Sequence, residues 1–228
     1  MLMMVVAVTA ALLACTKDGR ENENDDVEIE PQYAGADTMT LRVVGSGEGG
    51  ILVLAGETEL YTLPLNGVTL YLDGSSVSAA EIESGMAAEV WYTGGVQETY
   101  PAKFSQVVAV SLSREDDARY DLCGLYLQVL EDLWNEDDGL NGGAEIVSVD
   151  LSKAPGGLTV GEKAAIAYAF SQRHGVEGLT MTFDELREEG YLAGEKTEDG
   201  KTAYSFTNGL LFTITPDESA EGEGFSLP

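Results

Sequence analysis

The side chains that could carry out chemistry are few in kind and scattered along the chain. His174 is the one histidine, and Cys15 and Cys123 are the two cysteines. Nucleophilic catalysis by a Ser-His-Asp or Cys-His set would depend on that single imidazole, and zinc sites usually combine several His or Cys ligands. His174 also precedes Gly175 at an expected helix end, where a cation interacts favourably with the helix dipole. The sequence therefore predicts no catalytic constellation.

One Gly-rich loop gathers oxygen ligands of the kind that calcium prefers, namely Asp137, Asp138, Asn141 and Glu145. Their spacing is not that of an EF-hand, because Ser148 stands at the twelfth place, where a bidentate Glu is required. A loop that ends a helix is the favoured interpretation, and a calcium site is the alternative. We expect no resident metal and no other cofactor.

Residues 45–50 match the G-x-G-x-x-G dinucleotide fingerprint letter for letter. That motif works only where a strand turns into a helix, whereas residues 51–54 continue as a strand. The pattern therefore favours a glycine-rich hairpin turn.

Pairs of carboxylates suited to a glycosidase are weak evidence for that activity in this sequence. With 40 acidic residues, some pairs must lie close together by chance.

Four aromatic residues, Trp91, Tyr92, Tyr71 and Tyr100, could line a sugar-binding face, since small barrels of the OB type bind oligosaccharides. Alternate members could equally belong to the core. Cys123 lies on an apolar helical stripe, so we expect it to be buried and inert.

Residues 2–13 are apolar apart from Thr9 and carry no charge, and Ala14 then precedes Cys15. The run is too short to cross a bilayer but suits the central region of a signal peptide. The stretch from Leu12 to Cys15 resembles a lipobox. This resemblance implies that residues 1–14 are a lipoprotein signal peptide, that Cys15 is lipidated, and that the mature protein is anchored on the outer face of the cytoplasmic membrane. If Cys15 is lipidated, Cys123 has no intramolecular disulfide partner.

The charge of the chain narrows the choice of partners. The 40 acidic residues against 12 basic ones give a formal net charge of −28. Nucleic acid and anionic lipid head groups need Lys and Arg to displace counterions, so we exclude both as partners. Residues 15–37 are acidic and poor in apolar side chains, which predicts a disordered tether. Residues 216–228 are predicted to be a flexible acidic tail.

Five short β-rich runs follow the tether, at residues 40–44, 50–54, 68–72, 87–93 and 105–112, with a brief helical signal at 78–83. They predict a small five-stranded OB-like β-barrel over residues 38–112. The stretch from Gly85 to Tyr92, with Gly94, Gly95, Glu98 and Tyr100-Pro101-Ala102 after it, resembles the YobA-like family of secreted small barrels. The resemblance implies a fold and an exported setting, and it carries over no catalytic residue.

Residues 113–215 predict a second, α+β domain that folds separately from the barrel. A long helix begins after residue 115, a strand is expected at 145–150, and capping boxes begin at Thr159 and Thr182. Asn208-Gly209 is expected to turn a final hairpin. This order predicts a winged-helix-like topology. The part from Arg114 onward holds 24 acidic and 8 basic residues, so DNA binding is not expected. This part is also similar to segments of exported proteins of Gram-positive bacteria.

Three functional hypotheses follow from these observations. The leading one is a non-enzymatic binding or adaptor protein of the cell envelope that recognises a protein, a peptide or a glycan. The second is a carbohydrate-binding module, which would need its aromatic side chains in one exposed patch. The third is a carboxylate-dependent hydrolase of envelope glycans, which would need a cleft that holds two acids, one with a raised pKa.

Overall fold

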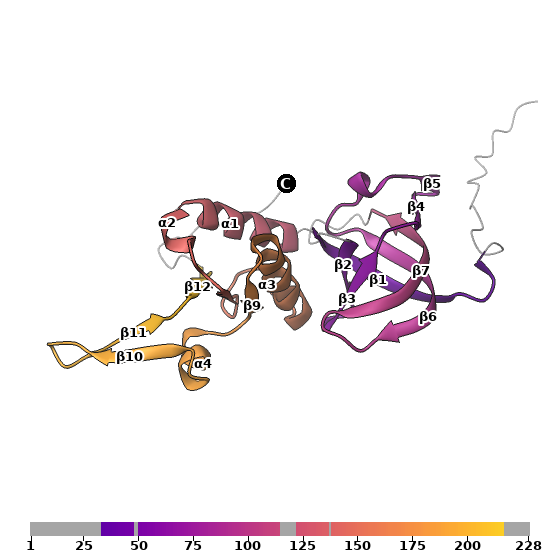
Figure 1. The fold of residues 1–228 in the computed structure, drawn as a ribbon. Coiled ribbons are helices and arrows are strands. Elements are labelled where there is room, and N and C mark those ends of the chain that lie inside the picture. Colours follow the sequence, from indigo (N-terminus) through magenta and orange to yellow (C-terminus); the bar gives the residue numbers. More distant parts are fainter. Residues whose placement is uncertain (1–32, 48–49, 115–121, 137, 217–228) are drawn as a thin grey trace, which may run out of the picture.

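The computed structural model describes residues 33–47, 50–114, 122–136 and 138–216. It has a mixed α+β architecture, in which a closed five-stranded barrel is followed by helices packed on a small sheet (Figure 1). The coarse prediction of a small barrel followed by an α+β part is confirmed. No helix in the described ranges is both long and apolar enough to cross a bilayer.

The barrel is built from strands of one continuous part of the chain. Its strands are β1 (Asp37–Gly47), β2 (Gly50–Ala55), β3 (Glu59–Pro64), β6 (Ala87–Gln97) and β7 (Ala102–Ser113). Neighbours in the order β3, β2, β1, β6, β7 are antiparallel, and parallel pairing of β3 with β7 closes the barrel. At one end β4 (Thr69–Leu72) pairs with β7 and with the short β5 (Ser75–Ser76), and a 3-10 helix follows at Ala79–Glu81.

The third barrel strand corrects the assignment made from the sequence. Residues 68–72 were expected to be that strand, but β3 takes the place and β4 only extends the sheet beside β7. In β3 the apolar side chains point to both faces of the sheet: Leu63 enters the barrel, and Leu60 packs outward against the helices. A strand buried on both faces loses the period-2 alternation by which it would be recognised.

The glycine-rich segment forms the expected hairpin. Strands β1 and β2 are antiparallel, and their register pairs Gly47 with Gly50 across the turn. Because no helix follows this turn, the dinucleotide interpretation has no structural basis.

The second part of the chain places helices on a three-stranded sheet. Its elements are α1 (Leu122–Glu136), α2 (Asp138–Asn141), β8 (Ile146–Asp150), α3 (Val160–His174), β9 (Glu177–Leu179), α4 (Phe183–Glu188), β10 (Leu192–Lys196), β11 (Thr202–Phe206) and β12 (Gly209–Thr213). Both predicted capping boxes are confirmed: Thr159 and Glu162 begin α3, and Thr182 and Glu185 begin α4.

The hairpin predicted at Asn208-Gly209 does not form. Strand β12 pairs in parallel with β8, whose other neighbour is β9, while β11 pairs with β10. The Asn208 carbonyl accepts hydrogen bonds from the backbone N–H groups of Glu145 and Ile146, at 2.8 and 3.2 Å, which places β12 beside β8. This arrangement packs Leu210 and Phe212 against the core, and their burial prevails over the local turn preference. The winged-helix topology is not confirmed.

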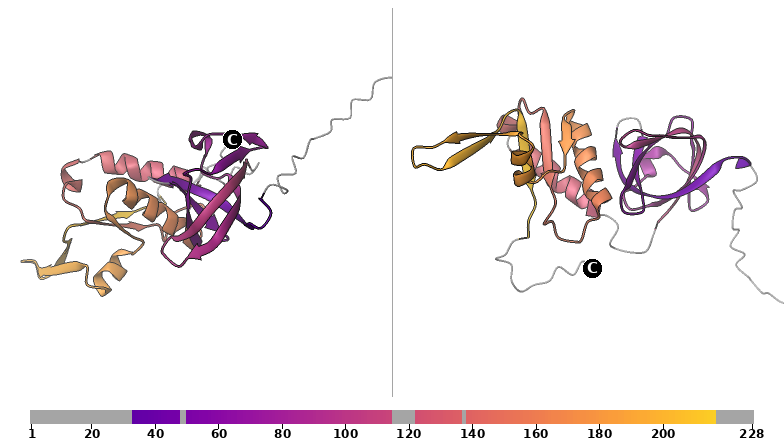
Figure 2. Two further views of the ribbon diagram at one scale, coloured as in Figure 1. Left: turned by 45° about the vertical axis from the view of Figure 1, so that its right-hand side comes forward. Right: turned by 90° about the horizontal axis from the view of Figure 1, so that it is seen from below.

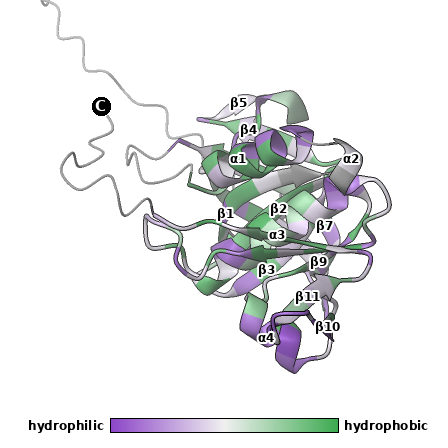
Figure 3. Cartoon of the chain, turned by 90° about the vertical axis from the view of Figure 1, so that its left-hand side faces the viewer, coloured by the Kyte–Doolittle hydropathy of each residue, from purple (hydrophilic) through white to green (hydrophobic). Residues whose placement is uncertain are grey.

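Two further features of the second part complete the fold. Strands β10 and β11 form an arm that projects from the body (Figures 1 and 2). Helix α4, which begins at the capping box of Thr182, is largely hydrophilic (Figure 3). The acidic residues Asp184 and Glu185 stand in its first turn.

The ends of the chain are described only in part. The last residues of the predicted tether lie against the barrel, since the Tyr33 ring centroid is 5.7 Å from that of Trp91 and β1 begins at Asp37. The predicted signal peptide, Cys15, the rest of the predicted tether and residues 217–228 lie outside the described residues.

Candidate binding groove between the barrel and helix α3

The helices are docked on the outside of the barrel through a shared core. Alternate residues of β2 face opposite ways: Ile51 and Val53 enter the barrel, whereas Leu52 and Leu54 pack against α1 and α3. Strand β1 contributes Val44 to the same shared core. The barrel and the helices are therefore joined by a buried apolar contact.

The start of α3 is held closely against the barrel. The Gly161 N–H donates to the Glu57 carbonyl at 2.7 Å, and a Cβ on Gly161 would lie 2.4 Å from a methyl carbon of Leu54. The Arg42 guanidinium on β1 lies 2.6 Å from a carboxylate oxygen of Glu162. Burial of Glu162 opposes its ionisation, but the Thr159 N–H and Arg42 outweigh this effect, so the pKa of Glu162 is lowered. These contacts fix one end of the helix.

The other end of α3 borders a groove of about 810 Å³. Its lining comes from the outer face of β2 and β3, from the loop between β6 and β7, and from the last two turns of α3. The lining residues are Gly50, Ile51, Leu52, Thr62, Pro64, Thr99, Tyr100, Pro101, Lys103, Tyr168, Ala169, Gln172, Arg173, His174 and Gly175. The volume is typical of sites that bind small molecules or short chains.

Two glycines let the walls of the groove take this form. A Cβ on Gly50 would lie 2.0 Å from the Leu63 carbonyl oxygen, so only glycine permits this approach of β2 to β3. Gly175 has φ of 65° and ends α3 in the left-handed conformation, as the His-Gly sequence predicted. The helix thus stops beside the groove.

Two tyrosines stand at the groove. Tyr100, in the β6–β7 loop, is 70% exposed, and Tyr168 comes from α3. Desolvation, and after it the neighbouring Tyr168, raise the pKa of Tyr100. The phenol of Tyr100 therefore stays neutral and able to donate a hydrogen bond at physiological pH.

The groove is lined by basic rather than acidic side chains. Lys103, Arg173 and His174 line it, and among the described residues no carboxylate does. Behind this wall, Glu131 on α1 lies 3.2 Å from an Arg173 nitrogen and 3.1 Å from Nε2 of His174. The His174 ring also stacks on Trp134, with the ring centroids 4.0 Å apart.

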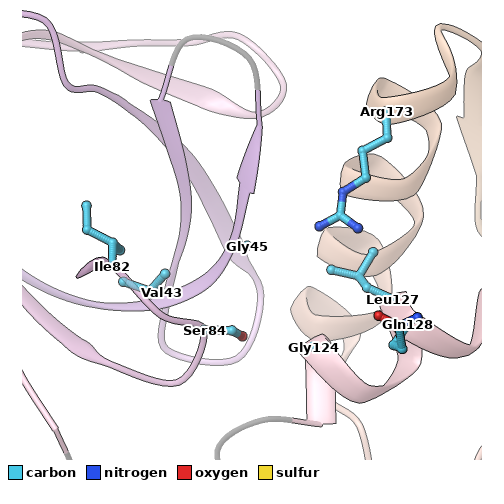
Figure 4. A pocket seen from close by; sticks show the side chains of 8 residues that line it. All are labelled: Val43, Gly45, Ile82, Ser84, Gly124, Leu127, Gln128 and Arg173. Carbon is cyan, nitrogen blue, oxygen red and sulfur yellow. The ribbon is translucent and has the colours of Figure 1, made fainter. Parts of the chain in front are cut away.

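A smaller pocket of about 170 Å³ lies between the barrel and helices α1 and α3. Figure 4 shows the Arg173 side chain reaching from α3 toward the barrel beside this pocket. The buried Ser84 hydroxyl also lines it and has no hydrogen-bond partner among the described residues. A cavity of this size with a free hydroxyl is suited to hold water.

The four aromatic residues predicted for a sugar-binding face are not brought together. Trp91 is buried beneath Tyr33, and the Tyr92 ring packs edge-on against Phe104 of the barrel interior, 4.8 Å away. Tyr71 lies near Tyr33, with their hydroxyl oxygens 3.3 Å apart. Only Tyr100 of the predicted four lines the groove.

Two of the four predicted calcium ligands, Asn141 and Glu145, have side chains that the structure describes, and both make other contacts. The Asn141 side chain donates to the Trp134 carbonyl, and Glu145 accepts from the Asn208 side chain at 3.3 Å. Asp137 and the side chain of Asp138 lie outside the described residues. Within the part that is described, no group of three potential His, Cys, Asp or Glu ligands gathers.

The hydrolase hypothesis finds no geometric support in the described residues. It required a cleft that holds two acids, one with a raised pKa, but neither pocket is lined by a carboxylate. Glu162, Glu185 and Asp199 have lowered pKa values, held down by hydrogen bonds to their ionised forms.

The sequence did not point to the groove residues Lys103, Tyr168 and Arg173. Tyr168 and Arg173 are distant in the chain from Tyr100 and Lys103, so no local pattern joins the two pairs. Cys123 is fully buried on α1, as its apolar neighbours predicted.

Comparison with known proteins finds nothing similar: no family model matches the chain, and no curated protein and no solved structure is significantly similar to it. The resemblances to lipoprotein signals and to the YobA-like family therefore remain expectations.

Proposed function

We propose that this chain is an exported, lipid-anchored and non-enzymatic binding protein of the cell envelope, whose ligand occupies the groove between the barrel and α3. The observation that carries the proposal is the groove itself, which combines exposed tyrosine, amide, hydroxyl and basic side chains on an otherwise acidic protein. Convergent polar groups in a well-formed groove are a usual mark of a binding site.

The position of the groove on the barrel supports this proposal. The strand order is consistent with a barrel of the OB type, in which ligands bind across the second and third strands and the loop between the last two. Here the floor is β2 and β3, and the rim is the β6–β7 loop with Tyr100.

Photo-crosslinking tests the location of the site. A benzophenone amino acid would replace Gln172, which is exposed in the groove, and in a control Asp132, which is exposed on α1 outside both pockets. We expect irradiation of intact cells to attach envelope material to the protein through position 172 and not through position 132. Equal labelling at both positions, or none at 172, would count against the groove.

The lipid anchor has a separate test. Cys15→Ser removes the sulfur that the proposed lipid requires, so we expect the variant to leave the detergent phase in a phase-partitioning assay. The control is Cys123→Ser, which changes the other cysteine and should partition like the unmodified protein. Normal detergent partitioning of Cys15→Ser would refute the anchor.

A further inference from the structure

The charge of the groove is opposite in sign to that of the whole protein. The chain carries −28, and yet the groove is lined by Lys103, Arg173 and His174 and by no described carboxylate. With so many acidic residues, a groove that no described carboxylate lines is a place on this surface where a bound anion meets little repulsion.

The two permanent cations of the groove lie on opposite walls. Lys103 comes from β7 and makes no ion pair with any described residue. Arg173 comes from α3 and uses one terminal nitrogen to contact Glu131. Since a guanidinium has five N–H donors, most of its donors remain for a ligand. Lys103 and Arg173 could thus contact an anionic ligand from both sides.

The remaining groups suit a sugar better than a peptide. An added peptide strand needs a free sheet edge, but the floor here is the side-chain face of β2 and β3, which are already paired with each other. A docked helix needs a broad apolar groove, whereas this one presents Thr62, Gln172 and two tyrosine hydroxyls. Phenol rings with hydroxyl and amide groups between them fit the flat, hydroxylated rings of a glycan.

We infer that the ligand of the groove is a carboxylate-bearing oligosaccharide, whose acid groups are bound by Lys103 and Arg173 and whose rings contact Tyr100 and Tyr168. This inference rests on the proposed function and names its ligand class.

Trp134 offers a direct readout because its ring stacks on His174 in the groove wall. In the Trp91→Phe background it is the sole tryptophan. The full chain without its signal peptide would be titrated with three probes of similar length: an oligogalacturonide, a neutral malto-oligosaccharide and an oligoglutamate peptide. We expect a saturable change in Trp134 fluorescence with the oligogalacturonide, and weaker binding of the other two.

Substitutions then locate the binding. Lys103→Gln and Arg173→Gln should each weaken oligogalacturonide binding about tenfold, the effect of losing one charged hydrogen bond. Lys153→Gln, which changes an exposed lysine outside the groove, should have no effect. Tyr100→Ala should weaken binding, and Tyr204→Ala, which changes an exposed tyrosine on the arm, should not. Circular dichroism would confirm that each variant is folded.

The other outcomes separate the two proposals. If the neutral sugar or the peptide binds as tightly as the oligogalacturonide and Lys103→Gln changes nothing, the acidic-glycan inference is wrong while the groove remains the site. If none of the probes binds, the acidic-glycan inference is also wrong, and crosslinking at position 172 then decides whether the groove binds another ligand.

Discussion

The interior of the barrel and the core shared with the helices lie on opposite faces of the same strands, but they depend on different parts of the chain. All the buried residues of the barrel interior fall between Leu41 and Leu112. The shared core combines Val44, Leu52, Leu54 and Leu60 of the barrel with side chains of α1, α3 and β8. The barrel thus encloses its own core, whereas the helical part completes its core with residues of the barrel.

This difference changes the expectation of two separately folding units. A barrel without the helices would keep its interior and expose an apolar face. Helices without the barrel would lose one wall of their core, and a fragment of this size has little stability to spare. Four predictions test this asymmetry, from the largest expected effect to the smallest.

Separation of the two parts should have the largest effect. We expect a fragment of residues 30–114 to unfold cooperatively and a fragment of residues 115–228 to lack fixed tertiary structure. Near-UV circular dichroism and the dispersion of amide NMR signals would measure both. A well-dispersed spectrum from residues 115–228 alone would show that the shared core is not needed for folding.

One phenylalanine from each core forms the second test. Phe104 in the barrel interior and Phe170 in the shared core are both fully buried, so each change to alanine should cost about 3–5 kcal/mol in the free energy of unfolding. The two substitutions should destabilise different regions of the chain. Hydrogen exchange should rise throughout the chain in Phe104→Ala, but mainly in α1, α3 and β8 in Phe170→Ala. The same exchange pattern in both variants would contradict the asymmetry.

Disruption of the close contact at the start of α3, by Gly161→Ala, should have a smaller effect on the free energy of unfolding. Alanine at position 161 places a methyl group against Leu54 and the Glu57 carbonyl, and overpacking of this kind costs about 1–3 kcal/mol. Denaturant unfolding would measure the loss. The control is Gln172→Ala, which changes an exposed residue on the same helix. A Gly161→Ala variant as stable as the control would mean that α3 can move away from the barrel without cost.

Loss of the ion pair between Arg42 and Glu162 should have the smallest effect on the free energy of unfolding. The size of this effect should depend on pH. The pKa of Glu162 is lower in the folded protein than its ordinary value of 4.5, so its contribution is present above pH 4.5 and declines as the pH falls through the folded pKa. Arg42→Gln should therefore be less stable than the unmodified protein by about 1–2 kcal/mol at pH 7. The difference should shrink in acid; a difference that stays constant between pH 7 and pH 3 would exclude this ion pair as its source.

Features set by a few neighbouring residues were predictable from the sequence. The two capping boxes, the end of α3 at Gly175 and the glycine-rich hairpin follow from local backbone and hydrogen-bonding requirements, and all are present. The burial of Cys123 followed in the same way from the apolar spacing of its own helix.

Features that depend on contacts distant in the chain were decided by the tertiary structure. Strand β3 was missed because α3 covers its outer face, and β12 joined β8 because burial of Phe212 outweighs a turn preference. The groove has the same origin. Lys103, Tyr168 and Arg173 come together only where α3 docks on the barrel, and no local pattern specifies which outer face of a barrel a later helix will cover.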